Sequence, residues 1–152
     1  MKAISLTKLD VSRGRMCAEV SIAQGARDTT PALAARALAE FPSLASHACV
    51  NEKGATFGHV IDNTPLPHLM EHLVIAYQMR ATLEKKRPPC AKVAGDVDGI
   101  PAPAADFTYL GTSEWIDESC GHARITVNFA DDLVALRAFR DAESFLNSIV
   151  VL

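Results

Sequence analysis

Residues 64–84 read TPLPHLMEHLVIAYQMRATLE, and this stretch sets the central helix of the fold. Thr64 followed by Pro65 is typical of a helix start, because threonine caps the first turn and proline tolerates the first helical position. Two prolines, Pro88 and Pro89, end the pattern, because proline breaks a helix interior. The sequence therefore predicts a helix from residue 64 to about residue 84.

This predicted helix has two different faces when its residues are placed about 100° apart. One face is apolar and predicts the main packing stripe: Leu66, Leu69, Met70, Leu73, Val74 and Tyr77. The residues on the opposite face are His68, Glu71, His72, Ile75 and Met79. The two histidines are therefore expected to lie away from the main packing stripe.

Upstream of this helix, the sequence predicts a hairpin and a shorter helix. Apolar and polar residues alternate over residues 4–7 and again over residues 16–22, with a turn expected at residues 12–15. Thr30 followed by Pro31 repeats the helix-start signal and predicts a helix over residues 31–41.

Downstream, residues 85–106 are rich in basic residues, proline and glycine, and predict an irregular surface loop inside a single domain of residues 1–152. A short strand is expected at residues 107–110 and a clearer one at residues 122–129. Asp131 or Asp132 caps a last amphipathic helix. These elements predict an α+β fold: a small, mostly antiparallel sheet with about three helices packed on it, the second carrying the two histidines.

The composition narrows the class of protein. The chain has 152 residues, enough for one ordinary core, with a net charge of −3 and an isoelectric point near 5.9. This charge disfavours nucleic-acid binding, and no apolar run approaches the roughly 20 residues that span a bilayer. The N-terminus lacks a secretory signal, so we expect a cytoplasmic protein. The cysteines, expected to be free thiols rather than a disulfide framework, are Cys17, Cys49, Cys90 and Cys120.

The candidate chemistry lies in residues 68–72, which read HLMEH and form an H-x-x-E-H motif. Imidazoles four residues apart on a helix lie on one face and can bind one zinc ion, while Glu71 lies beside the ion as a general base. With this chain's histidine and glutamate content, chance predicts only about 0.01 such motifs. The alternative is a solvated helix face on which Glu71 pairs with a lysine or arginine.

A catalytic zinc ion needs a third protein ligand. Glu114 is one candidate, because it follows a predicted strand end and would complete a His₂Glu set. The other candidates are Glu118, Asp117, His122, His59 and His47.

Two further polar side chains, His122 and Arg124, are predicted to project from the same face of one strand. If that face lines the cleft, His122 polarises the scissile carbonyl and Arg124 holds a substrate carboxylate. The alternative is an ordinary exposed strand face. For Trp115, packing is favoured over a role as a wall of the site.

Several segments together resemble the N-terminal domain of cyanophycin synthetase. They are residues 41–44 (FPSL) with His47 and Cys49, residues 57–60, residues 64–78, residues 111–114 and residues 121–145. In that family the helix reads GHxxEHxALELQ and precedes an FGxTRE segment, a strand and a closing helix. The resemblance implies a zinc metallopeptidase-like domain that binds or trims a branched Asp–Arg polymer. It further implies that His68, His72 and Glu114 are metal ligands and that Glu71 is the general base.

Two functions follow as hypotheses. The first is a zinc-dependent hydrolase of amide bonds in a peptide-like, cyanophycin-like substrate, with one zinc ion per chain and with Glu71, His122 and Arg124 in catalysis. The second is a non-catalytic module that binds a polymer or partner and holds a vestigial or structural metal. Expected partners are a peptide-like or polymer substrate, and either a second copy of the chain or a separately encoded ligase, but neither nucleic acid nor membrane.

Overall fold

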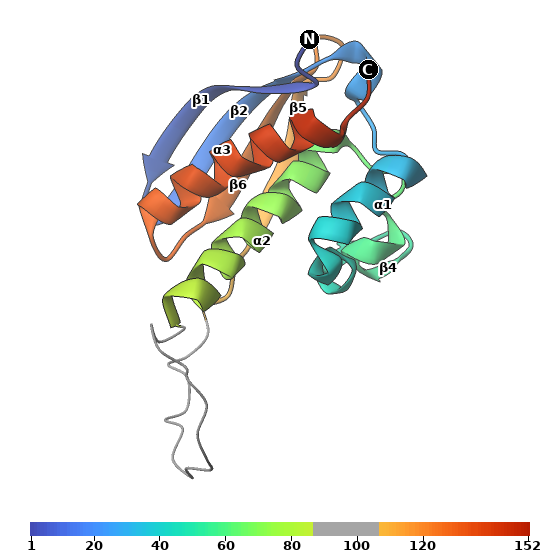
Figure 1. Cartoon of the computed structure of the whole chain (residues 1–152). Helices are drawn as coiled ribbons and strands as arrows, with labels where there is room; N and C mark the ends of the chain where they lie inside the picture. The colour runs from blue at the N-terminus through green and yellow to red at the C-terminus, as the bar shows by residue number, and fades with distance from the viewer. Residues whose placement is uncertain (87–106) are drawn as a thin grey trace.

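The computed structural model describes residues 1–86 and 107–152, which form a four-stranded antiparallel sheet with helices on one face (Figure 1). The strands are β1 (Ile4–Ser12), β2 (Arg15–Ile22), β5 (Gly111–Asp117) and β6 (His122–Asn128). Their order in the sheet is β1-β2-β6-β5, so β5 is an edge strand. A second sheet pairs β3 (Ala48–Asn51) with β4 (Gly54–Thr56).

The helices are α1 (Pro31–Glu40), α2 (Leu66–Lys86) and α3 (Asp132–Ile149). Figure 1 shows α2 and α3 side by side across the sheet, with α1 and the β3–β4 hairpin at one end. The expected α+β fold is confirmed, including the mostly antiparallel sheet and the H-x-x-E-H motif on the second helix. Within the described ranges, none of the helices has the length and apolarity needed to cross a membrane.

The β1–β2 hairpin turns at Arg13 and Gly14, both with positive φ, 49° and 75°. Two successive residues of this conformation make the tight turn whose twist matches that of antiparallel strands. The hairpin was predicted correctly, although β1 extends beyond residue 7 to Ser12.

The core lies between the inner face of the sheet and helices α2 and α3. Alternate residues of β2 and β6 face inward and are buried, as their patterns predicted: Met16, Ala18, Val20, Ile22, Ala123, Ile125 and Val127. Helix α3 begins at the predicted cap, where Asp131 accepts hydrogen bonds from the backbone amides of Leu133 and Val134.

Helix α2 is buried on both faces: the histidine face, expected to lie away from the main packing stripe, is also covered by protein. Glu71 and His72 are only 6% and 4% exposed. His72 is covered by the segment between α1 and α2, in which Phe57 is fully buried and stacks on its ring, and Glu71 is covered by β5 at Gly111. The solvated-face interpretation of the motif is therefore wrong, because these side chains are covered by protein.

Several predicted boundaries differ from the structure. The expected strand at residues 107–110 has no regular structure, and the strand instead spans Gly111–Asp117. The sequence assigned Lys85 and Lys86 to a loop, but they form the end of α2. The rest of that predicted loop, residues 87–106, lies outside the described residues. The β3–β4 hairpin was not predicted, because strands of four and three residues are too short to show a clear alternation.

Candidate metal centre

A cavity of about 870 Å³ lies beside helix α2, where β5, the β3 strand and the turn before β3 approach it. The H-x-x-E-H motif forms part of its polar wall, because His68, Glu71 and His72 all line it. Apolar and aromatic side chains form much of the remaining wall, and no lysine or arginine of the described residues lines it. This combination of an apolar cavity and a few convergent polar groups is typical of a small-molecule or substrate site.

Three possible metal ligands converge in this cavity. One ligand atom each from Cys49, His68 and His72 lies within 4.8 Å of the others. The Cys49 sulfur is 3.4 Å from Nε2 of His68. Thiolate and imidazole are the donors that zinc prefers, so the Cys–His–His set fits a zinc ion.

The orientation of His68 is fixed by a hydrogen bond on the far side of its ring. Its Nδ1 lies 2.8 Å from the hydroxyl of Thr64, which leaves Nε2 facing Cys49. Thr64 is itself held in place, because its backbone amide donates to the hydroxyl of Thr29. Metal-binding histidines commonly use such a partner on the second ring nitrogen, and this arrangement supports a ligand role for His68.

The position of Cys49 depends on Asn51 at the end of β3. The amide nitrogen of Asn51 donates to the backbone carbonyls of Cys49 and Thr56, at 3.0 Å each, and approaches the Cys49 sulfur at 3.8 Å. Its side-chain oxygen accepts from the backbone amides of Lys53 and Gly54. One side chain thus closes the hairpin and supplies a donor to the sulfur.

His72 is enclosed by aromatic rings. Phe57 stacks on it with ring centroids 4.0 Å apart, and Nδ1 of His47 lies 3.3 Å from Nδ1 of His72. Burial, together with the nearby His68 and His47, lowers the pKa of His72 to about 3. A neutral imidazole has a free ring-nitrogen lone pair, which is the form that binds a metal ion.

Glu71 lies between the two histidines in sequence and faces strand β5. Burial raises the pKa of Glu71 to about 7, although a hydrogen bond with Ser113 opposes this shift. A Cβ atom on Gly111 would lie 2.7 Å from Cγ and 2.8 Å from Oε1 of Glu71. Glycine at this position therefore leaves the space that the carboxyl group occupies.

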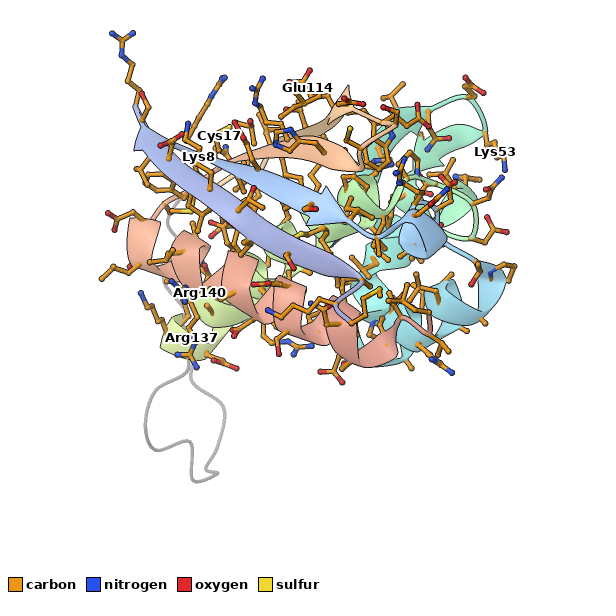
Figure 2. The ribbon with its side chains drawn as sticks, turned by 90° about the horizontal axis from the view of Figure 1, so that it is seen from above. Lys8, Cys17, Lys53, Glu114, Arg137 and Arg140 are labelled. Atoms are coloured by element: carbon orange, nitrogen blue, oxygen red, sulfur yellow. The ribbon has the colours of Figure 1, made fainter. Side chains whose placement is uncertain are left out.

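Glu114, the ligand implied by the resemblance, is not brought together with the two histidines. It lies in the middle of β5, where alternation turns Gly111 and Ser113 toward α2 and Glu114 toward the outer face of the sheet. Its Oε1 accepts from Nη1 of Arg124 at 3.2 Å, although part of the residue borders the cavity. Figure 2 shows Glu114 on the side of the sheet away from α3, which carries Arg137 and Arg140.

His122 and Arg124 share one strand face, as predicted, but this is the outer face and not a wall of the cavity. Nε2 of His122 lies 3.1 Å from a carboxylate oxygen of Glu19, and Arg124 lies 3.8 Å from the other. These side chains, together with Glu114, form an ion-pair network on the exposed side of the sheet. The structure thus supports the exposed-strand alternative for both residues.

Of the remaining candidate ligands, His47 lines the cavity and contacts His72, whereas the others lie elsewhere. His59 contacts Thr56, and Asp117 accepts from the hydroxyl of Ser119, so neither faces the cavity. Glu118 is exposed in the turn after β5. Trp115 packs against the core and also lines the cavity.

Sequence reasoning did not consider Cys49 as a possible metal ligand, and it named His47 only as one candidate third ligand, without its contact with His72. A cysteine far from the motif in sequence carries no spacing signal of its own. Cys17, Cys49 and Cys120 are free thiols, as expected, and Cys90 lies outside the described residues. The available signal was the resemblance, in which both His47 and Cys49 belong to the quoted segments.

No protein-family model, curated protein or solved structure matches this chain. The functional assignment therefore rests on the geometry of the cavity.

Proposed function

We propose that this protein is a zinc-dependent hydrolase of amide bonds in peptide-like substrates. The observation that carries the proposal is the convergence of Cys49, His68 and His72 in one cavity that Glu71 also lines. These three residues would hold the ion. A zinc ion so held would supply Lewis-acid chemistry for polarising a substrate carbonyl and for activating water.

Glu71 is the proposed general base. Its carboxylate accepts a proton from the attacking water and later passes it to the amine that leaves. Its surroundings suit this transfer, because a buried carboxyl group beside few hydrogen-bond donors has a pKa near neutral, about 7 here. Ser113 and Gly111 position the carboxyl group, the first by a hydrogen bond and the second by leaving space.

The cavity favours a catalytic over a structural metal. Structural zinc sites in proteins have four protein ligands, whereas catalytic sites keep one position for water or substrate. In the described part of the chain, the group that can hold a metal comprises three residues, and these border a cavity of about 870 Å³.

The substrate class is proposed from the wall of the cavity. Its acidic side chain is Glu71, because Glu114 borders the cavity but pairs with Arg124 on the outer face of the sheet, and no basic side chain of the described residues lines the cavity. This charge favours neutral or basic substrate groups over free carboxylates. The arginine side chains of a cyanophycin-like polymer fit this requirement and agree with the family resemblance.

The test compares the wild type with Glu71→Gln for bound zinc and for hydrolysis of a mixed library of acetylated peptides and of cyanophycin. We expect one zinc ion in both proteins and a loss of activity of about 100-fold or more in the variant. Glu118→Gln, on an exposed turn, is the matched control and should retain full activity. Absence of stoichiometric zinc from wild type purified with zinc would refute the proposal.

A different result would favour the non-catalytic alternative. In that case Glu71→Gln leaves every measured property intact, while His68→Ala lowers the free energy of unfolding of the zinc-loaded protein.

A further inference from the structure

Strand β5 borders the candidate site with an open edge. In the described part of the chain it pairs only with β6, because the sheet order places it last. An edge strand presents backbone amides and carbonyls without a ladder partner, and an extended chain can pair with them.

The register of β5 shows which backbone groups point outward. The carbonyl of Leu110 accepts from the amide of Asn128, so this pair is of the hydrogen-bonded kind. Pairs alternate along an antiparallel ladder, so Thr112 and Glu114 direct their amides and carbonyls toward β6. Gly111 and Ser113 direct their backbone amides and carbonyls to the open side of β5. In the described part of the chain, these groups take part in none of the backbone hydrogen bonds outside the sheet ladders and helices.

This open edge runs along the candidate cavity. The lining includes every residue from 107 to 115, inward-facing and outward-facing alike, which indicates that the cavity follows the edge of the strand rather than one face of it. Gly111 and Ser113 are also the two residues of β5 that contact Glu71. The unpaired backbone groups and the proposed general base therefore belong to the same wall.

We infer that the open edge of β5 binds the main chain of an extended peptide, which pairs with Gly111 and Ser113 and so brings one of its carbonyl groups beside Glu71. The inference rests on the proposed function and specifies its substrate class, an extended chain in which residues i and i+2 both keep an unsubstituted backbone amide. Main-chain pairing tolerates many side chains, and alternate ones point toward and away from α2.

The first test follows amide hydrogen exchange in zinc-loaded Glu71→Gln and in zinc-free wild type. The probe is a mixed library of acetylated, amidated hexapeptides, which suits recognition through the main chain. We expect exchange at Gly111 and Ser113 to slow about fivefold at saturation, as one added hydrogen bond predicts. The amides of Thr112 and Glu114, already paired with β6, serve as internal controls.

The second test removes a single donor. Proline is tolerated where an edge strand's amide points outward, so Ser113→Pro removes the proposed donor without removing a bond to β6. Ser113→Ala is the matched control, because it removes the hydroxyl beside Glu71 and keeps the amide. We expect the apparent affinity for the peptide library to be about fivefold weaker in Ser113→Pro than in Ser113→Ala.

The outcomes separate this inference from the proposed function. The inference alone would be overturned if the protein hydrolyses peptides with zinc while the amides of Gly111 and Ser113 show no protection and the two Ser113 variants bind peptide equally well. Protection of both amides in a protein that binds no zinc would overturn the proposed function alone. Protection that grows with protein concentration in the absence of peptide would assign the edge to a second copy of the chain and also overturn the inference.

Discussion

The sulfur of Cys49 and Nε2 of His68 lie 3.4 Å apart although the two residues are 19 positions apart in the chain. Cys49 belongs to the β3–β4 hairpin and His68 to the first turns of α2. The candidate metal centre thus joins a small peripheral hairpin to the central helix of the domain, and each side can be tested separately.

Cys49→Ser should lower zinc affinity by about 100-fold or more, because serine lacks the soft thiolate that zinc prefers. Competition with a chromophoric chelator measures this affinity. Cys17→Ser, on the outer face of β2, is the matched control and should bind zinc as the wild type does. Unchanged affinity in Cys49→Ser would remove Cys49 from the ligand set.

Thr64→Val should weaken zinc binding by about 10- to 100-fold while leaving all three ligands in place. The hydroxyl of Thr64 holds Nδ1 of His68, and its loss frees the ring to rotate. The same chelator competition measures the effect. Thr126→Val on the outer face of β6 provides the control, and equal affinities for the two variants would contradict the prediction.

Gly111→Ala should reduce hydrolysis at least about tenfold and destabilise the protein by about 1–3 kcal/mol. The added Cβ would lie 2.7 Å from Cγ of Glu71, so the carboxyl group must move. Activity assays and urea unfolding measure the two effects. At Gly25 an added Cβ meets only Leu152 at 3.8 Å, so Gly25→Ala should change neither quantity much.

The pH dependence of stability should differ between metal-free wild type and Glu71→Gln. The pKa of Glu71 is raised from 4.5 to about 7 by burial, so the folded state binds its proton more tightly than the unfolded state. Tighter proton binding by Glu71 stabilises the folded state fully below pH 4.5. This stabilisation is lost as the pH rises through 7.

The free energy of unfolding of wild type relative to Glu71→Gln should therefore fall by about 3 kcal/mol between pH 4.5 and pH 8. Urea unfolding in a chelating buffer measures it. The opposite pH dependence of His72, whose pKa is lowered, is present in both proteins and cancels in the difference. A difference that stays constant with pH would contradict the buried position of Glu71.

The parts of the fold that the sequence predicted are those with local signals. Helix α3 starts at the predicted Asp131 because a cap is a contact between near neighbours, and β6 shows its alternation over a full strand. The β3–β4 hairpin is held largely by Asn51 and by contacts with the turn Phe57–His59, and neither leaves a periodic pattern.

The candidate site was predicted in part for the same reason. His68, Glu71 and His72 share one helix face, so their spacing suffices. Glu114 illustrates the opposite case: the predicted strand ended before it, whereas in the observed strand Gly111–Asp117 it lies mid-strand and side-chain alternation turns it outward. Cys49 approaches the motif only through tertiary structure.

The placement of Cys49 in a two-stranded hairpin has a consequence for how the metal enters and leaves. Such a hairpin is marginally stable by itself, and it can open while the four-stranded sheet and its helices remain folded. Opening would remove the proposed sulfur ligand from Nε2 of His68. The lifetime of the bound ion is thus expected to follow the opening rate of about nine residues of local structure, and not the unfolding rate of the domain.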